Sequence, residues 1–326
     1  MNHGITDVPG FEVGHREDRR GATGCTVILC PPGTVGGMDI RGSAAGTRQT
    51  DSLQSFHFVD EVHAILLSGG SAFGLDATGG VMKYLEERGI GYSTSAGKVP
   101  IVPTAIIYDL AIGEGRIRPD SQMGYEACVN RRSGKIEEGS VGVGTGATVG
   151  KLLGIPYATK GGVGTHSVGR SNGLIVGALV VVNAFGDVVD PGAGGKILAG
   201  ARDPHNPGRF IDSAQSMKRG IPAGSRREAF QHTTLGVVAT NARLTKRQAI
   251  KVAQMAHVGL ARTISPVHST VDGDLIFALS AGHESADVNS IGLMAEEAVA
   301  MAVIRAIKAA DGLGILPAYQ DLHKSG

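Results

Sequence analysis

Short apolar runs rich in β-branched residues recur along the chain and predict buried strands. Each run is bounded by Gly, Pro or Asp, which is typical of strands that lie inside a sheet. The runs cover residues 25–30, 63–67, 104–109, 174–183, 233–240 and 275–280.

Three other segments have the period of an amphipathic helix. The clearest covers 245–264, where Thr245 and Gln248 form a capping-box pair at its start. A second helix is expected around 294–312 and a third over 74–89, each ending at a glycine. Strands and helices therefore mix throughout the chain. This mixture indicates the α/β class, with one domain or two interlocked halves over 326 residues.

Residues 186–224 show neither the apolar runs of the predicted strands nor the period of an amphipathic helix. They are rich in Gly, Pro, Asp, Arg and Ser, and Asp203 to Gly208 reads Asp-Pro-His-Asn-Pro-Gly. The segment predicts a long surface connection without regular structure. Such loops are uncommon in compact domains unless they serve function or processing, and this one ends just before Thr233.

Composition excludes several classes of protein. The formal net charge is +1, which lacks the basic field that a phosphate backbone requires, so no nucleic-acid partner is expected. The three cysteines have no C-x-x-C spacing, which disfavours a disulfide framework and a structural zinc site. The amino terminus has no basic and apolar secretory signal, and the longest apolar run is too short to span a bilayer. A cytoplasmic location away from membranes is expected.

Two glycine-rich motifs resemble nucleotide sites but fail their patterns. Gly69-Gly70-Ser71 follows a predicted strand and precedes a helix, yet it matches neither G-x-G-x-x-G nor G-x-S-x-G. It is a structural tight turn or a substrate-pocket wall that offers backbone N–H groups, while a nucleophilic Ser71 is the third alternative. The run from Gly144 to Lys151 lacks the phosphate-loop glycine and hydroxyl residue, so we reject a nucleotide.

Lys151 remains of interest because it follows so many glycines. Backbones pack closely around glycine, so this lysine is either poorly solvated and available to stabilise charge, or an ordinary surface lysine. The histidines contain no H-E-x-x-H and no local cluster with metal-ligand spacing. His63, His166 and His268 are interpreted as structural residues. No metal and no other cofactor is expected.

Thr233 stands where a polar pair, Gln231-His232, runs into a predicted strand. If the peptide bond before Thr233 broke, its hydroxyl would gain an adjacent α-amine with a pKa near ~7.7, a base suited to neutral pH. Nucleophile and base would then share one residue. The alternative is a threonine that merely opens a strand.

Asp272 and Asp274 lie two residues apart at the entrance of the 275–280 strand, so both are expected to project to one side. Two carboxylates that close cannot ionise independently. One of them could hold an ammonium or hydroxyl while the other has a raised pKa, which suits proton handling during amide cleavage. The alternative is a pair of solvated turn aspartates.

The motifs, taken in order, resemble a known family of self-processing amidohydrolases. It includes L-aminopeptidase/D-esterase, β-peptidyl aminopeptidase and the nylon-oligomer (6-aminohexanoate oligomer) hydrolase. The resemblance runs nearly end to end, and its motifs are Asp7-Val-Pro-Gly-Phe-Glu-Val-Gly-His, Asp39-Ile-Arg-Gly-Ser-Ala-Ala-Gly-Thr-Arg, Gly69-Gly-Ser-Ala-Phe-Gly, Ala105-Ile-Ile-Tyr-Asp-Leu, Gly144-Thr-Gly-Ala-Thr-Val-Gly-Lys, Val181-Val-Asn, Thr233-Thr-Leu and Asp272-Gly-Asp.

The resemblance implies a role for each matching residue. Thr233 matches the nucleophile that is freed by self-cleavage, and Asp272 and Asp274 match the acidic pair that orients it. Asn183 matches an amide donor to the oxyanion. The remaining matches are Lys151, an electrostatic stabiliser, and Tyr108, a hydroxyl that positions substrate. One position departs from the nylon-hydrolase pattern, which has Asn before the nucleophile where this chain has His232.

The resemblance also implies a fold and an assembly. It implies a four-layer α/β/β/α sandwich, cut into a large subunit of 1–232 and a small subunit of 233–326 that stay together as one structural domain. It suggests a homotetramer of processed protomers that acts on a small peptide or amide. Two alternatives remain: an acyltransferase of the ornithine acetyltransferase-like fold, and an uncleaved binding or scaffold protein.

Overall fold

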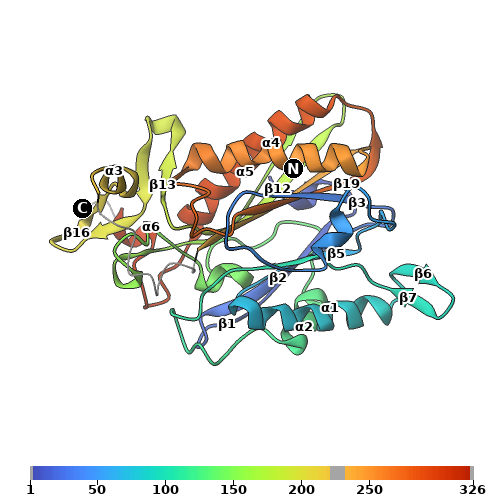
Figure 1. The fold of residues 1–326 in the computed structure, drawn as a ribbon, viewed down its shortest axis with the longest axis horizontal. Helices are drawn as coiled ribbons and strands as arrows, with labels where there is room; N and C mark the ends of the chain where they lie inside the picture. The colour runs from blue at the N-terminus through green and yellow to red at the C-terminus, as the bar shows by residue number, and fades with distance from the viewer. Residues whose placement is uncertain (1–2, 221–231, 324–326) are drawn as a thin grey trace.

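Two five-stranded sheets form the centre of the molecule (Figure 1). The computed structural model describes residues 3–220 and 232–323. The strands of the first sheet are, in spatial order, β1 (Glu12–Asp18), β2 (Thr23–Leu29), β5 (Ala64–Ser68), β8 (Thr104–Ile106) and β4 (Gly46–Arg48). Those of the second are β11 (Gly162–Gly169), β12 (Ile175–Asn183), β17 (Thr233–Ala242), β19 (Leu275–Glu284) and β3 (Val35–Ile40).

Helices cover the outer face of each sheet (Figure 1). The first sheet carries α1 (Ala77–Glu86) and α2 (Ser121–Val129). The second carries α4 (Lys246–Thr263) over β3 and β19, and α5 (Val288–Ala309) over β11 and β12. The layers therefore run helix, sheet, sheet, helix, and the predicted α/β/β/α sandwich is confirmed.

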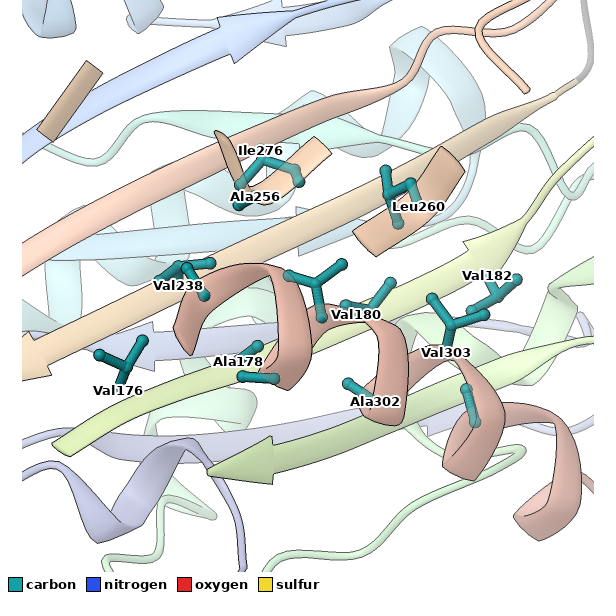
Figure 2. Packing of buried hydrophobic residues seen from close by; sticks show 14 of the residues in the cluster. Val176, Ala178, Val180, Val182, Val238, Ala256, Leu260, Ile276, Ala302 and Val303 are labelled. Carbon is teal, nitrogen blue, oxygen red and sulfur yellow. The ribbon is translucent and has the colours of Figure 1, made fainter. Parts of the chain in front are cut away.

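The strand β12 shows why its sequence is apolar throughout. Val176, Ala178, Val180 and Val182 lie in the core under α4 and α5, as Figure 2 shows. The alternate residues, including Leu179 and Val181, lie in the core between the two sheets. Because successive side chains of a strand point to opposite faces, a strand covered on both sides needs apolar residues at every position.

The predicted strands and helices are all present. The predicted strand over 104–109 is shorter than expected, since β8 ends at Ile106 and Tyr108 and Asp109 follow it outside the ladder. The capping box of Thr245 and Gln248 is formed at the start of α4. The helices predicted around 294–312 and over 74–89 are α5 and α1.

The expectation of an unstructured connection over 186–224 is wrong for residues 186–220. This stretch folds into short elements on the left of Figure 1: β13 (Asp187–Asp190), β14 (Lys196–Ala199), β15 (Ala201–Asp203), β16 (Asn206–Ile211) and α3 (Ser213–Lys218). The buried Asp187 carboxylate organises them by accepting hydrogen bonds from Ala201 N at 2.9 Å and Ser213 N at 2.7 Å. Residues 221–224 lie outside the described residues.

The remaining elements are short. They are β6 (Tyr92–Thr94), β7 (Gly97–Val99), β9 (Thr148–Val149), β10 (Thr159–Lys160), β18 (Ile264–Ser265), α6 (Tyr319–Leu322) and the 3-10 turns Ile5–Asp7, Thr50–Leu53, Ser71–Asp76, Gly142–Gly146, Ile155–Tyr157 and Pro191–Ala193. Within 3–220 and 232–323, no helix has the length and apolar character needed to cross a bilayer.

Candidate active site

Three strand ends of the second sheet meet at one point and carry most of the predicted site residues. Asn183, the last residue of β12, pairs across the antiparallel ladder with Thr233, the first residue of β17. The strand β19 runs parallel to β17, so the residues that precede it lie beside the start of β17. Asp272 accordingly forms a parallel bridge with His232. Sheet register thus gathers residues that are far apart in sequence.

The peptide bond between His232 and Thr233 is buried, and its carbonyl oxygen accepts two hydrogen bonds. The carbonyl oxygen of His232 accepts a hydrogen bond from Thr233 Oγ1 at 2.6 Å and another from Gly273 N at 2.8 Å. Both residues are 5% exposed. The His232 ring packs against the ring of Phe185, with 5.2 Å between centroids. The hydroxyl predicted to be the nucleophile therefore lies against the carbonyl group that it would attack.

The acidic pair flanks this bond. Asp274 Oδ1 accepts a hydrogen bond from Thr234 N at 2.7 Å, while Asp272 Oδ1 accepts one from Phe185 N at 3.1 Å. Both aspartates are 1% exposed, so they are not solvated turn residues. Burial raises the pKa of Asp272 to about 6, and the neighbouring Asp274 adds to this shift.

Asn183 and Lys151 form a buried pair next to Thr233. Lys151 Nζ donates to Asn183 Oδ1 at 2.8 Å and to the Asn183 backbone carbonyl at 2.9 Å. Thr148 N also donates to Asn183 Oδ1, at 3.1 Å. Because two donors converge on the oxygen of this amide, its orientation is fixed and its NH2 group points the other way. Lys151 is thus a buried lysine and not a surface one.

Burial has a strong effect on the charge of Lys151. It lowers the pKa of the ammonium group to about 7, while the negative charge of Asp272 acts in the opposite direction. A second lysine, Lys160, is equally buried and also has its pKa lowered to about 7 by burial. Its Nζ donates to the carbonyl oxygens of Thr145 and Ala147 at 2.8 and 2.9 Å, directly before Thr148.

Tyr108 reaches the site through its backbone. Its carbonyl oxygen accepts a hydrogen bond of 3.4 Å from Asn183 Nδ2, so the segment that follows β8 lies beside the side-chain amide of Asn183. The side chain of Tyr108 is half-buried. This contact places Tyr108 with the other site residues, and its predicted hydroxyl role stays a prediction.

The Gly69-Gly70-Ser71 loop is tied to the segment that carries Tyr108. Its three backbone N–H groups donate to Gly24 O at 2.8 Å, Asp109 Oδ1 at 2.7 Å and Ile107 O at 3.0 Å respectively. These groups are therefore used inside the protein, as the tight-turn interpretation expects. Contact between this loop and a substrate stays a prediction.

Several residues of the site were given no role there from the sequence: His268 was interpreted as a structural residue, and Asp109 and Ser269 were not singled out. Asp109 is buried between Gly70 N and Thr23 Oγ1, which donates to it at 2.7 Å, and burial raises the pKa of this carboxyl to about 6. His268 and Ser269 bind the two aspartates directly. The signal for these two was their position a few residues before the acidic pair.

The described residues contain no group of three or more His, Cys, Asp or Glu side chains that is arranged to hold a metal ion. The groups gathered here are a hydroxyl, two carboxylates, an ammonium and an amide, together with a backbone N–H on a peptide carbonyl. Such a set can supply a nucleophile, proton acceptors and oxyanion donors for acyl transfer.

Comparison with known proteins agrees with this chemistry. The model of peptidase family S58 matches residues 3–315. An uncharacterised aminopeptidase of Mycobacterium leprae is 40% identical, over 97% of this chain and 92% of the relative. A 6-aminohexanoate-oligomer endohydrolase of Kocuria sp. is 30% identical, over 93% of this chain and 85% of the relative.

A solved structure has the same fold. The L-aminopeptidase D-Ala-esterase/amidase of Ochrobactrum anthropi, described as a variant of the Ntn hydrolase fold, superposes with a TM-score of 0.70. It covers 95% of this chain and 87% of its own, at 21% identity. The alternatives of an acyltransferase and of a scaffold protein are not favoured by these matches. The chain belongs to peptidase family S58 and is a hydrolase of amide bonds.

Proposed function

We propose that the chain cleaves itself between His232 and Thr233 and that the freed Thr233 is the nucleophile of the mature amide hydrolase. The proposal rests on the contact of Thr233 Oγ1 with the carbonyl oxygen of His232 at 2.6 Å. The cut would give a large subunit of 1–232 and a small subunit of 233–326, which together form the single sandwich described above.

Self-cleavage begins with attack of Thr233 Oγ1 on the carbonyl carbon of His232. The hydroxyl proton leaves to a base, the negative charge forms on the His232 oxygen, and the C–N bond then breaks with protonation of the Thr233 nitrogen. The Gly273 N–H, already bound to that oxygen at 2.8 Å, is placed to stabilise the charge. Water then hydrolyses the resulting ester and releases the Thr233 hydroxyl.

The same groups serve substrate hydrolysis. The new α-amine of Thr233 is the base for its own hydroxyl. Asp272 and Asp274 orient the nucleophile and its amine, and Asn183, held by Lys151, donates its amide N–H to the oxyanion of the substrate. Tyr108 and the Gly69-Gly70-Ser71 loop line the substrate side. No metal or other cofactor takes part in this scheme.

The substrate class follows the names of the relatives, which are an aminopeptidase and an oligoamide endohydrolase. We propose that the chain hydrolyses small peptides or linear amides, and that it works in the cytoplasm as a homotetramer of processed protomers, without a nucleic-acid or membrane partner. A panel of amino-acid amides, β-peptides and 6-aminohexanoate oligomers separates the activities. Sedimentation of the purified protein measures the assembly.

Replacement of the two neighbouring threonines tests the nucleophile. Thr233→Ala removes the attacking oxygen, so it should leave one full-length chain without hydrolase activity. Thr234→Val is the matched control, because Thr234 Oγ1 is buried without a hydrogen-bond partner among the described residues, and valine has the same shape. It should cleave normally. The measurements are intact mass and Edman sequencing of the small fragment, which should begin Thr-Thr-Leu-Gly. Any other start, or an intact and active chain, contradicts the proposal.

A further inference from the structure

His268 makes two contacts with one oxygen of Asp274. Asp274 Oδ2 accepts a hydrogen bond from His268 N at 3.1 Å and lies 2.9 Å from the ring nitrogen His268 Nδ1, within hydrogen-bond distance. The other oxygen, Oδ1, accepts from Thr234 N at 2.7 Å. A single buried carboxylate therefore links the histidine to the residue that follows the proposed nucleophile.

The contact with Asp274 bears on which ring nitrogen of His268 carries a proton. A carboxylate oxygen without a proton can only accept hydrogen bonds, so in that form of Asp274 the proton of the contact lies on His268 Nδ1. The His268 side chain is 20% exposed. The contact survives whether the ring is neutral or charged, and it is stronger when the ring is charged.

The backbone of His268 has a conformation that the contact needs. Its φ is +54°, in the left-handed region where histidine and asparagine are among the more common non-glycine residues. This conformation brings the backbone N–H and the ring to the same carboxylate oxygen. Asparagine at this position would keep both the conformation and a donor near the place of Nδ1, whereas alanine would lose the donor.

The His268 ring has an aromatic neighbour on α4. The His257 ring of α4 lies edge-on at 4.9 Å, and burial lowers its pKa to about 4, so it is neutral near neutral pH. Its Nε2 is 3.0 Å from the backbone carbonyl of Asp39 and 3.7 Å from the carboxylate of that residue on β3, which pairs with Arg41. On the segment of His268 itself, Asp272 is the other charged neighbour, beside Asp274.

We propose that His268 is a positioning residue, which holds the Asp274 carboxylate aligned with the Thr234 N–H at the start of β17. This inference rests on the proposed function, because alignment of β17 matters for catalysis only if Thr233 is the nucleophile. Through Asp274, the histidine fixes where the Thr233 hydroxyl and its later amine lie. His268 itself touches neither the scissile carbonyl nor Thr233 in the described contacts.

The first experiment measures the contact without any activity. Exchange of the Thr234 amide hydrogen is followed by NMR in the Thr233→Ala protein, which is expected to stay one chain. Because Asp274 accepts this N–H, loss of its alignment should raise the exchange rate in His268→Ala by ~10-fold or more, the effect of losing a hydrogen bond to a charged group. His268→Asn should stay close to the parent protein. Equal exchange in all three overturns the proposal.

The second experiment measures self-cleavage and amide hydrolysis in variants that keep Thr233. In His268→Ala, kcat and the rate of self-cleavage should fall by ~10 to 100-fold with little change in KM, since the histidine does not contact substrate. His268→Asn should recover most of the rate. His283→Asn, on the exposed end of β19, is the control and should behave as wild type.

The outcomes separate the two proposals. If the wild-type chain neither cleaves nor hydrolyses amides, the proposed function fails, while Thr234 exchange still decides whether His268 aligns Asp274. If exchange rises in His268→Ala but kcat and the rate of self-cleavage stay unchanged, the positioning role is overturned and the proposed function stands. If His268→Asn is as impaired as His268→Ala, the donor is not what the site needs, and the proposal is also overturned.

Discussion

Asn183 is held by its oxygen, and this decides what its nitrogen can do. Lys151 Nζ and Thr148 N both donate to Oδ1, so the NH2 group is directed away from them, toward the Tyr108 carbonyl. The lysine therefore acts on the site at least partly through the asparagine, by fixing which end of the amide faces the reaction. A conservative change at either residue should disturb the same donor.

Asn183→Ala should slow both self-cleavage and amide hydrolysis. Loss of one oxyanion donor typically costs ~100 to 1,000-fold in kcat. Lys151→Met should be impaired less, because Thr148 N still holds the amide oxygen. Cleavage is followed on denaturing gels and turnover with an amide substrate. Asn289→Ala, at an exposed position of α5, is the control, and near-normal rates in Asn183→Ala contradict the assignment.

The raised pKa of Asp272 predicts an acid limb in the rate profile. Burial and the charge of Asp274 raise this pKa to about 6, so the carboxyl takes up a proton as the pH falls through 6. If the ionised form orients the nucleophile, kcat/KM should decline below about pH 6. Asp272→Asn should be slow at every pH and lose that limb. A wild-type rate that is constant from pH 5 to 7 would speak against a role for the ionised pair.

The elements of the site differ in how far the sequence predicts them. The strands that become β12, β17 and β19 are apolar on both faces, so a local pattern is enough to place them. Their order and register are long-range properties, and only these bring Lys151, Asn183, Thr233 and Asp272 together. The acidic pair was predicted from its spacing, but its burial was not, because a turn of Asp and Gly is usually solvated.

Residues 186–220 show where local pattern misleads. Gly, Pro and Asp indicate a loop, yet one buried carboxylate, Asp187, gives the segment its order through Ser213 and Ala201. His268 was interpreted only as a structural residue for a related reason. A histidine near a strand entrance has no periodic signal, and its partner Asp274 can be identified only when the turn between them is known.

The helix α5 approaches β11 so closely that a glycine is required. A Cβ atom on Gly164 would lie 2.1 Å from the carbonyl oxygen of Ala302 and 2.4 Å from Ala306 N, both backbone atoms of α5. Gly164→Ala should therefore push the helix outward and lower the free energy of unfolding by about 1–3 kcal/mol. Denaturant unfolding of the uncleaved Thr233→Ala protein measures this. Gly134→Ala has open space around its Cβ and should change little; equal stability of the two variants would refute the close approach.

At the scale of the whole molecule, two buried lysines make stability depend on pH. Burial lowers the pKa values of Lys151 and Lys160 from 10.5 to about 7, so between these values the unfolded chain binds more protons than the folded one. The free energy of unfolding should therefore rise with pH above 7, by up to ~1.4 kcal/mol per pH unit for each lysine. Burial raises the pKa of Cys25 and Cys30 above the ordinary value of 9, which opposes the rise beyond that pH.

The dependence of stability on pH is therefore tested between pH 7 and 9. Denaturant midpoints of the Thr233→Ala protein should increase across it. Lys160→Met removes one of the two lysines, and it should lose about half of the slope whatever its absolute stability. A profile that is flat in the parent protein, or a slope that Lys160→Met leaves unchanged, contradicts the prediction.

The strand order β11-β12-β17-β19-β3 has a consequence for what the proposed cut leaves behind. The two strands that follow the cut, β17 and β19, lie between β12 and β3, which both precede it. Each mature protomer would be a heterodimer in which one fragment supplies the middle of a sheet and the other supplies both sides. Its dissociation would then follow mass action, so the melting temperature of the processed protein should depend more steeply on protein concentration than that of the uncleaved chain.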